Sequence, residues 1–295
     1  MLTLWINDLK LIDKVNWLQY SIAPRPIALA STIDAVGNVN LSPFSFFNLF
    51  SYNPPLVIFS PSRRGRDNTT KHTLENIYEV PEVAINICDY DMVHQVSLSS
   101  TEYPRNTDEF IKAGFTRLPS TVIRPPRVKE AKVQLECKVT EVKSLGETGG
   151  AGQLVLAEVI CMHVDESVLN DDRSMIAQTK LHHVARLGGD WYCVVDETNL
   201  FRLPKPNREL GIGVDSLPES IRNSEILTGN ELAHLANVKE MPLVDPAFDD
   251  EQLRNIIQYF SVDPSEMEKE LHRYAKQLLA QNKLHEAWQV LLAGI

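Results

Sequence analysis

The chain has 295 residues, of which 43% are hydrophobic and 23% charged, and its formal net charge is −10 at pH 7. This composition is typical of a soluble globular protein with a proper core. The acidic surplus argues against general nucleic-acid binding, because a phosphate backbone is held by excess lysine and arginine. No apolar run approaches the ~20 residues that cross a bilayer, and the N-terminus lacks a signal-peptide pattern. We therefore expect a cytoplasmic protein that binds neither membranes nor nucleic acids.

The segment from about residue 15 to residue 205 is dominated by strand patterns. The β-rich run at 25–33 is followed by DAVGN, a turn suited to a hairpin. Short apolar runs at 55–60 and 83–88 are typical of strands buried on both faces. Many strands joined by turns favour a barrel over a doubly wound sheet.

Two further strands and two short helices are expected in the same segment. Apolar and polar residues alternate over 133–140, which predicts a strand with one buried face. A glycine-rich turn then leads into a long strand at 153–164. Short helices are expected near Thr73–Tyr78, which must end before Pro81, and near Asp108–Ala113.

The four cysteines and eight histidines carry no sign of a metal site or a disulfide. Cys88, Cys137, Cys161 and Cys193 form no close pair, and each lies in an apolar or alternating run. We interpret them as reduced core residues. No histidine spacing matches a metal motif, so no metal is expected.

The remainder of the chain, residues 214–295, has helical patterns. A capping box stands at 228–231, and apolar residues repeat with helical spacing over 253–260 and 284–292. Another helix is expected to begin at Asp263-Pro264 and to be broken by Asn282. One helical pair cannot bury a continuous core alone, so we expect an appendage packed on the barrel or on a partner subunit.

A basic loop, SPSRRGRDNTTKHT, interrupts this acidic chain at residues 60–73. Its cations and hydroxyl groups surround a glycine, and such groups supply the hydrogen bonds and charge that a phosphate dianion needs. Its cations are Arg63, Arg64, Arg66 and Lys71. Taken alone, these four cations favour a solvated basic loop over a phosphate site. The segments that flank the loop must therefore distinguish a solvated loop from a phosphate site.

A series of motifs flanks this loop in a consistent order. They are RPIALAST (25–32), GNVNLSPFSFFN (37–48), NPPLVIFS (53–60), KHTLENI (71–77), EFIKAGF (109–115), RPPRV (124–128), LEC (135–137) and VARLGGDWY (184–192). In this order and spacing the chain resembles the flavin reductase-like family, whose fold is an FMN-binding split β-barrel. The resemblance covers about residues 15–205 and implies a mainly β split barrel with short inserted helices, which we assign to residues 1–213. The helical extension at 214–295 lies outside the resemblance.

The resemblance also implies a homodimer with FMN near the subunit interface. Ser31 and Thr32 would lie beside the isoalloxazine, and the NLSPFS segment would wrap the flavin. Lys71 would help to hold the 5′-phosphate, close to a helix N-terminus that favours anions. The cofactor-binding residues implied by position are Ser31, Thr32, Asn40, Leu41, Ser42, Pro43, Ser45, Ser60, Ser62, Arg63, Lys71 and Thr73.

Other positions are less specific. Arg64 and Arg66 are expected to face solvent, and His72 replaces an aspartate that is common in the family. Arg186 and Tyr192 stand where family members approach the open face of the flavin, so they are predicted to bind substrate, although as bare residues they also suit a structural strand end.

The implied function is that of an FMN-dependent oxidoreductase, in which NAD(P)H passes a hydride to the flavin. The cofactor supplies the chemistry, and no side chain stands out as an acid or a base, so the catalytic residues are left unknown. One alternative is an FMN-binding electron-transfer or sensing protein without a nicotinamide site. Another is a scaffold that has lost its flavin, which the retained hydroxyl-rich loops disfavour.

Overall fold

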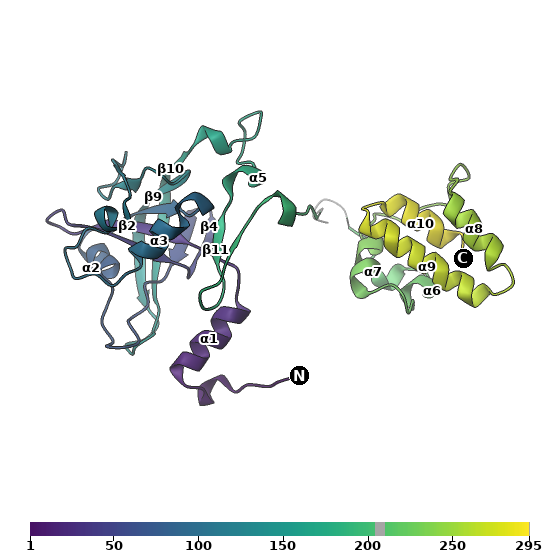
Figure 1. Cartoon of the computed structure of the whole chain (residues 1–295), viewed down its shortest axis with the longest axis horizontal. Coiled ribbons are helices and arrows are strands. Elements are labelled where there is room, and N and C mark those ends of the chain that lie inside the picture. The colour runs from purple at the N-terminus through teal and green to yellow at the C-terminus, as the bar shows by residue number, and fades with distance from the viewer. Residues whose placement is uncertain (204–209, 295) are drawn as a thin grey trace. The chain divides into compact units, whose positions relative to one another are not determined.

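The computed structural model describes residues 1–203 and 210–294 (Figure 1). The chain forms two compact units, Met1–Phe201 and Arg202–Ile295. The sequence places the boundary after residue 213. In the structure, Ile212 and Gly213 donate backbone hydrogen bonds to Val238 and Ala236, and Ile212 packs on the core of the helical unit. No helix in the described part of the chain is long and apolar enough to cross a bilayer.

A seven-stranded sheet, ordered β3-β2-β6-β9-β10-β5-β4, organises the N-terminal unit. All its neighbouring strands are antiparallel. Its strands are β2 (Ala28–Ile33), β3 (Val39–Phe44), β4 (Phe47–Tyr52), β5 (Pro55–Phe59), β6 (Glu82–Ile87), β9 (Val133–Ser144) and β10 (Gln153–Val164). The smaller sheets contain β1 (Arg25–Pro26), β11 (Val184–Arg186) and β12 (Tyr192–Val194), and β7 (Arg117–Leu118) with β8 (Arg127–Val128). The predicted mainly β fold is confirmed.

Short helices interrupt this sheet. They are α1 (Leu11–Ser21), α2 (His72–Glu79), α3 (Val93–Ser99), α4 (Glu109–Ala113) and α5 (Gln178–Leu181). Helices α2 and α4 confirm two predictions, and Asp108 caps α4 by accepting a hydrogen bond from the amide of Phe110. Helices α1, α3 and the four-residue α5 were not predicted. No residue of α1 is buried, so it has no core-facing stripe, and α3 has only seven residues.

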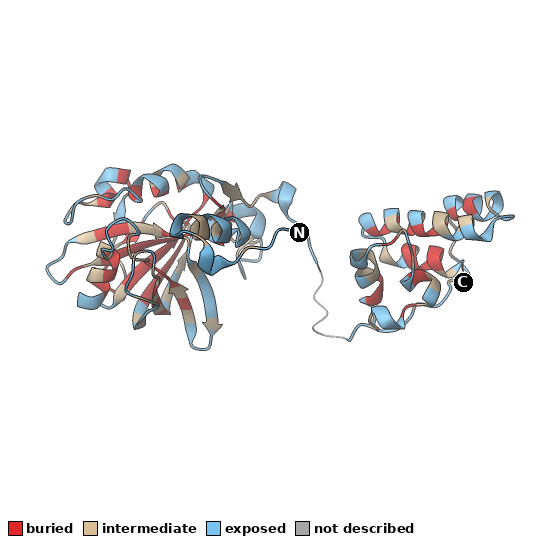
Figure 2. Ribbon diagram, turned by 90° about the horizontal axis from the view of Figure 1, so that it is seen from below, coloured by how far each residue is buried: buried red, intermediate tan, exposed pale blue. Residues whose placement is uncertain are grey.

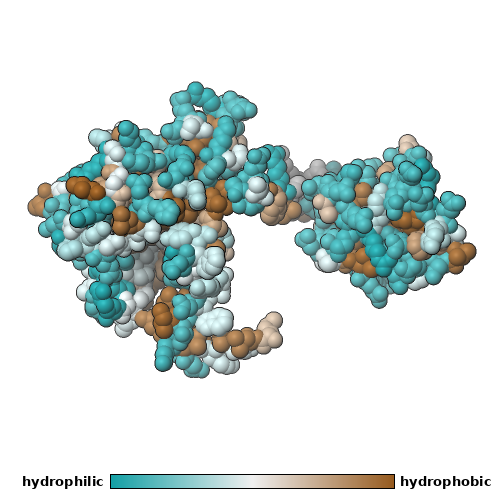
Figure 3. All heavy atoms as spheres, viewed as in Figure 1, coloured by the Kyte–Doolittle hydropathy of each residue, from teal (hydrophilic) through white to brown (hydrophobic). Residues whose placement is uncertain are grey.

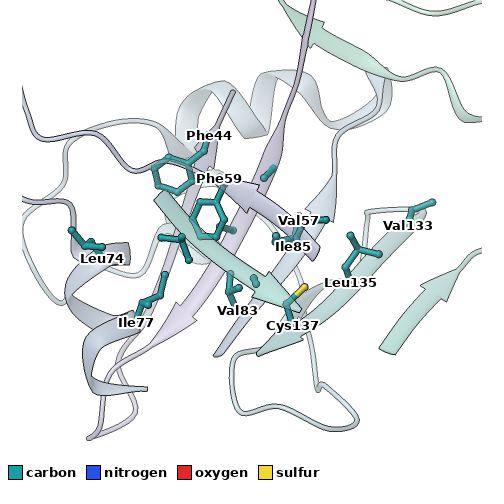
Figure 4. Packing of buried hydrophobic residues seen from close by; sticks show 14 of the residues in the cluster. Phe44, Val57, Phe59, Leu74, Ile77, Val83, Ile85, Val133, Leu135 and Cys137 are labelled. Carbon is teal, nitrogen blue, oxygen red and sulfur yellow. The ribbon is translucent and has the colours of Figure 1, made fainter. Parts of the chain in front are cut away.

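The main core lies between the sheet and α2. Figure 4 shows Leu74 and Ile77 of α2 near the aromatic pair Phe44 and Phe59, whose ring centroids are 5.4 Å apart. Burying each such side chain contributes about 1.5–3 kcal/mol to stability. This packing fixes α2, and therefore the end of the basic loop, against the sheet.

The prediction for β9 was wrong over its first half. Val133 to Cys137 are all buried, so both faces of the strand are covered there. The polar residues of the alternation have partners inside the protein. Glu136 accepts hydrogen bonds at 2.7 Å from the amides of Thr121 and Val122 and lies 2.7 Å from His163 Nε2. Burial acts to raise the pKa of Glu136, but these hydrogen bonds lower it overall.

The four cysteines are free thiols in the structure, but only two of them belong to the core, whereas the sequence predicts core positions for all four. Cys88 and Cys137 are buried, whereas Cys161 and Cys193 are half-buried. Cys161 lies in the second half of β10, where no residue is fully buried, and all three residues of β12 are half-buried.

The C-terminal unit is a separate helical domain. Its helices are α6 (Glu219–Arg222), α7 (Gly229–Ala236), α8 (Glu251–Tyr259), α9 (Pro264–Ala280) and α10 (Leu284–Leu292). They confirm the predicted capping box, the proline-initiated helix and the break at Asn282, which has φ 59°. Figure 2 shows that each unit has its own buried residues. The helical core surrounds the fully buried Trp288, so the last helical pair is covered by the other helices of this unit.

We expect the helical unit to lose stability in mild acid because of His272. This side chain is buried, and its Nδ1 lies 2.8 Å from Ser224 Oγ, which accepts hydrogen bonds from two amides. The Ser224 hydroxyl is therefore free to donate to a neutral imidazole. Burial lowers the pKa of His272. The stabilisation is complete above the unfolded value of about 6.5 and is lost as the pH falls below it.

Denaturant unfolding followed through Trp288 would measure this effect. A background with Trp5, Trp17 and Trp191 changed to phenylalanine isolates the signal, since those three indoles are exposed. The unfolding free energy should fall between pH 7 and pH 5, and His272→Gln should flatten the dependence. An equal slope in the glutamine variant would assign the acid sensitivity to another group.

Candidate functional site

The basic loop joins β5 to α2 and is held by backbone hydrogen bonds. Two of these bonds connect Arg63 to the β9–β10 turn. The amide of Arg63 donates to the carbonyl of Ala151 at 2.9 Å, and the amide of Gly150 donates to the carbonyl of Arg63 at 3.0 Å. Within the loop, Arg64 and Asn68 form a tight turn in which Asn68 has φ 58°. These hydrogen bonds give the loop a defined conformation and place its last residues beside the sheet.

A small polar pocket lies where this loop meets β3, α2 and the segment after α3. It is lined by Asn40, Ser42, Arg64, Lys71, His72, Thr73, Ser99, Ser100, Thr101, Glu102, Tyr103 and Glu109. We call it the loop pocket. Four predicted residues meet in it: Asn40, Ser42, Lys71 and Thr73. Asn40 Nδ2 donates to Thr73 Oγ1 at 2.8 Å, which links β3 to the first turn of α2.

The loop pocket has an unusual balance of charges. Burial, followed by the nearby charge of Arg64, lowers the pKa of Lys71. Glu102 lies 3.3 Å from Arg64 and 3.1 Å from Arg66. Burial also raises the pKa of Glu109, although the amide of Leu41 opposes this by donating to it. A half-buried lysine beside a neighbouring arginine of the same charge favours an added anion.

Among the arginines of the loop, Arg64 does not face solvent as the sequence predicts, whereas Arg66 does. The Arg63 guanidinium donates to Asn68 Oδ1 at 2.7 Å and to the Asn68 carbonyl at 2.6 Å, and Arg63 does not line the pocket. Arg64 lines the pocket and donates to Thr69 Oγ1 at 3.0 Å and to the carbonyl of Thr70. Arg66 is exposed and pairs with Asp67 and Glu102. Sequence reasoning missed Arg64 and Glu102, because adjacent arginines in a loop carry no signal of direction.

The other predicted cofactor residues do not line the loop pocket. Ser31, Thr32 and Leu41 are buried in β2 and β3; Thr32 accepts a hydrogen bond from Asn76, whereas Ser31 Oγ has no partner among the described residues. Ser60 Oγ accepts from the amide of Gln153 at 3.0 Å. The half-buried members of the set are Pro43, Ser45, Ser62 and Arg63. Their roles stay predictions.

A second cavity, of about 470 Å³, lies between α3 and the β11–β12 hairpin. It brings together the two residues predicted to bind substrate, since Arg186 Cζ lies 4.6 Å from the centre of the Tyr192 ring. We call it the α3 cavity. It is lined by Tyr90, Val93, His94, Ser97, Val184, Arg186, Asp190, Tyr192, Cys193 and Val194. Because Ser99 lines the loop pocket, the two sites lie along one short helix.

A cavity along α8 and a group of three potential metal ligands give less indication of a functional site. A larger cavity of about 630 Å³ lies along α8, but no cation lines it. Glu136, Cys161 and His163 place three potential metal ligands within 4.8 Å of one another. However, Arg127 Nε lies 3.4 Å from the Glu136 carboxylate, and a fixed cation there opposes a divalent ion. We interpret this group as a structural network.

Comparisons with known proteins identify the N-terminal unit. Residues 20–183 match the family described as the flavin reductase like domain. An uncharacterized protein of Halalkalibacterium halodurans is 35% identical over 212 residues, which cover 69% of this chain and 99% of the relative. The matched family segment ends before the helical unit begins.

Solved structures agree with this match. Nitrilotriacetate monooxygenase component B from Bacillus cereus is 32% identical, with a TM-score of 0.64 over 69% of this chain and 98% of that one. The 2-nitrobenzoate 2-nitroreductase NbaA from Pseudomonas fluorescens is 26% identical, with a TM-score of 0.63 over 72% and 100%. A Shewanella frigidimarina protein described by its split barrel domain has a TM-score of 0.57 at 27% identity, covering 68% of this chain and 96% of that one. The chain therefore belongs to the flavin reductase-like family and has its split-barrel fold.

Proposed function

We propose that the N-terminal unit binds FMN with the 5′-phosphate in the loop pocket. The observation that carries this proposal is the meeting of Lys71, Arg64 and the hydroxyls of Ser42 and Thr73 in one small polar pocket. These groups fit a phosphate, because cations and hydroxyls both donate to its oxygens. The family match supports a flavin as the ligand.

The first turn of α2 strengthens the fit. The pocket contains His72 and Thr73, and their amides donate to no acceptor within the described residues. Free amides at a helix N-terminus, together with the helix dipole, favour an anion there. Glu102 opposes the phosphate by charge, so phosphate binding would replace Glu102 as the partner of Arg64.

We further propose that the flavoprotein is an oxidoreductase that takes electrons from NAD(P)H. When bound, FMN would supply the redox chemistry, while the chain binds and orients the reactants. The names of two similar structures, a monooxygenase component and a nitroreductase, support a redox role. The α3 cavity, with Arg186 and Tyr192, is the proposed entry for the second reactant. The alternative is an electron-transfer protein that has no nicotinamide site.

An anaerobic assay separates these two functions. We expect NADH or NADPH to bleach the absorbance of bound FMN, and Arg186→Gln to slow this bleaching at limiting nucleotide. Photoreduction provides the control, since it reduces flavin without any nucleotide. Flavin that is photoreduced normally but is never bleached by either nucleotide would favour the electron-transfer alternative.

We propose that the protein works as a homodimer. Large apolar side chains are exposed on the N-terminal segment and α1 (Figure 3). They include Trp5, Ile12 and Trp17, and Phe50 on β4 is exposed as well. Strand β4 is also an edge of the main sheet, where unpaired backbone groups invite association. A second copy of the chain would cover both the exposed apolar side chains and the unpaired edge of β4.

Light scattering should therefore give about twice the 33.3 kDa chain mass. Phe50→Lys should shift the protein toward the monomer, because a charge would be buried in the interface. Tyr259→Lys is the matched control, since Tyr259 is an aromatic residue that is even more exposed than Phe50 but belongs to the helical unit. A wild-type monomer that binds FMN fully would contradict the proposal.

A further inference from the structure

The α3 cavity combines apolar walls with one well-placed cation. Its volume of about 470 Å³ lies within the ~300–1,000 Å³ typical of small-molecule sites. Val93, Val184, Val194 and two tyrosines supply its apolar surface. His94, Ser97, Arg186 and Asp190 are its polar groups. Such a lining suits a ligand with a flat apolar body and a single polar end.

The Arg186 side chain is held in place, yet most of its donors are free. Its guanidinium lies over the Tyr192 ring, 4.6 Å from the centre, and one nitrogen donates to the Gly189 carbonyl at 2.8 Å. A guanidinium has five N–H donors, and no other acceptor contacts this one within the described residues. A planar, fixed guanidinium with free donors matches the two oxygens of a carboxylate.

The neighbouring Arg25 increases the positive charge behind this site. Arg25 and Arg186 are Cα partners in the β1–β11 ladder. Arg25 is buried, and its guanidinium donates to the carbonyls of Gln19, Ile22 and Leu187 at 2.6–2.7 Å. Carbonyls do not neutralise it, and neither arginine has an ion pair among the residues that the structure describes. In a chain with net charge −10 this is a local excess of positive charge.

Another arginine of the fold shows the contrast. Arg117 also lies over an aromatic ring, that of Phe110, at 5.4 Å. Unlike Arg186, it is ion-paired, with Asp108. The only acidic side chain that lines the α3 cavity is Asp190, and it forms no ion pair with Arg186. The guanidinium of Arg186 is therefore available to an anion from outside.

We propose that the α3 cavity binds a flat organic anion, with Arg186 holding the anionic group and the valine and tyrosine side chains covering the ring. The role of this anion as a reactant rests on the proposed oxidoreductase function, whereas its binding does not. Two kinds of molecule combine a flat ring with an anionic group, namely a free aromatic carboxylate and the nicotinamide dinucleotide, whose anionic groups are its phosphates.

Calorimetric titration of 2-naphthoate and its neutral isostere 2-naphthamide into the full-length protein would test the proposal. Naphthoate should bind about ten- to a hundredfold more tightly, because a charge-assisted hydrogen bond distinguishes the two. Arg186→Gln should abolish this preference, and Arg117→Gln should preserve it. Asp190→Asn should increase it by about two- to fivefold, which keeps the test decisive even if the Arg186 variant is unstable.

Equal affinity for the two probes, or a preference that survives Arg186→Gln and is unchanged in Asp190→Asn, would overturn the proposal. Competition identifies the source of the anion: displacement of naphthoate by NADH supports the dinucleotide, and its failure supports a free aromatic acid. FMN titrations of the same variants keep the two hypotheses apart. In the wild-type protein, absence of the naphthoate preference with normal FMN binding rejects only this inference, whereas absent FMN binding with the preference intact rejects only the proposed function.

Discussion

Replacing Lys71 or Arg64 with alanine should weaken FMN binding by about ten- to a hundredfold. Both cations line the loop pocket, and each would lose a charge-assisted hydrogen bond to the phosphate, worth about 1.5–3 kcal/mol. Riboflavin has no phosphate, so its affinity should barely change in either variant. Fluorescence titration of both flavins at two salt concentrations would measure the ratio, and the FMN preference should also fall with added salt.

Arg63→Ala and Glu102→Gln make this experiment sharper. The sequence assigns Arg63 to the phosphate, but its guanidinium donates twice to Asn68, which predicts a smaller, indirect loss. Glu102 competes for Arg64 at 3.3 Å, so Glu102→Gln should strengthen FMN binding severalfold without affecting riboflavin. If Arg63→Ala is damaging while Arg64→Ala is harmless, the loop rearranges when it binds flavin. Equal affinity for FMN and riboflavin in the wild type would remove the loop pocket as the phosphate site.

The helical unit could be predicted closely because its signals are local. A capping box at Thr228, a proline at the first position of α9 and a left-handed Asn282 are each readable within a few residues. Apolar stripes then identify the buried faces of α8 and α10. In contrast, α1 has no buried face at all, so its sequence carries no stripe to read.

The site was only partly predictable because it depends on contacts between distant segments. The resemblance assigns Asn40, Ser42, Lys71 and Thr73 to the cofactor site as a whole, and the structure brings all four to the loop pocket. The segment at 99–103 enters the same pocket from α3, but nothing in its sequence links it to a loop some 30 residues earlier. Likewise, the direction of the Arg64 side chain depends on one tight turn within the loop. Backbone hydrogen bonds to the β9–β10 hairpin, which is distant in the sequence, support this turn.

The alternation in β9 shows the same limit within a single strand. Polar residues at every second position predict an open face when no partner is visible in the sequence. Here the segment around Thr121 and Val122 covers that face and donates two amides to Glu136. The polar positions are therefore interior contacts, although their pattern is that of a surface.

Glu136→Ala should consequently destabilise the N-terminal unit by about 3–5 kcal/mol, as expected when one partner of a buried ion pair is removed. Glu136 is fully buried, and its carboxylate faces the buried Arg127, whose other two nitrogens donate to Gln134 and to the carbonyl of Pro119. Alanine would leave the guanidinium charge uncompensated and two amides without acceptors, each costing about 1–3 kcal/mol. Hydrogen exchange should show loss of protection in β9 and around residue 121.

Glu136→Gln is the matched comparison, because it removes the charge and keeps the side-chain shape and one of the two acceptor oxygens, so that only one of the two amides loses its acceptor. Its loss should fall between the wild type and alanine, while Thr140→Ala, an exposed-side change on the same strand, should cost far less. The double variant Arg127→Met/Glu136→Leu separates charge from packing. If the cost of Glu136→Ala comes from a stranded cation, removing both charged groups should recover much of the stability, since buried pairs are often replaced by apolar residues with little loss. If the double variant is as unstable as Glu136→Ala, the two orphaned amides, rather than Arg127, account for the loss.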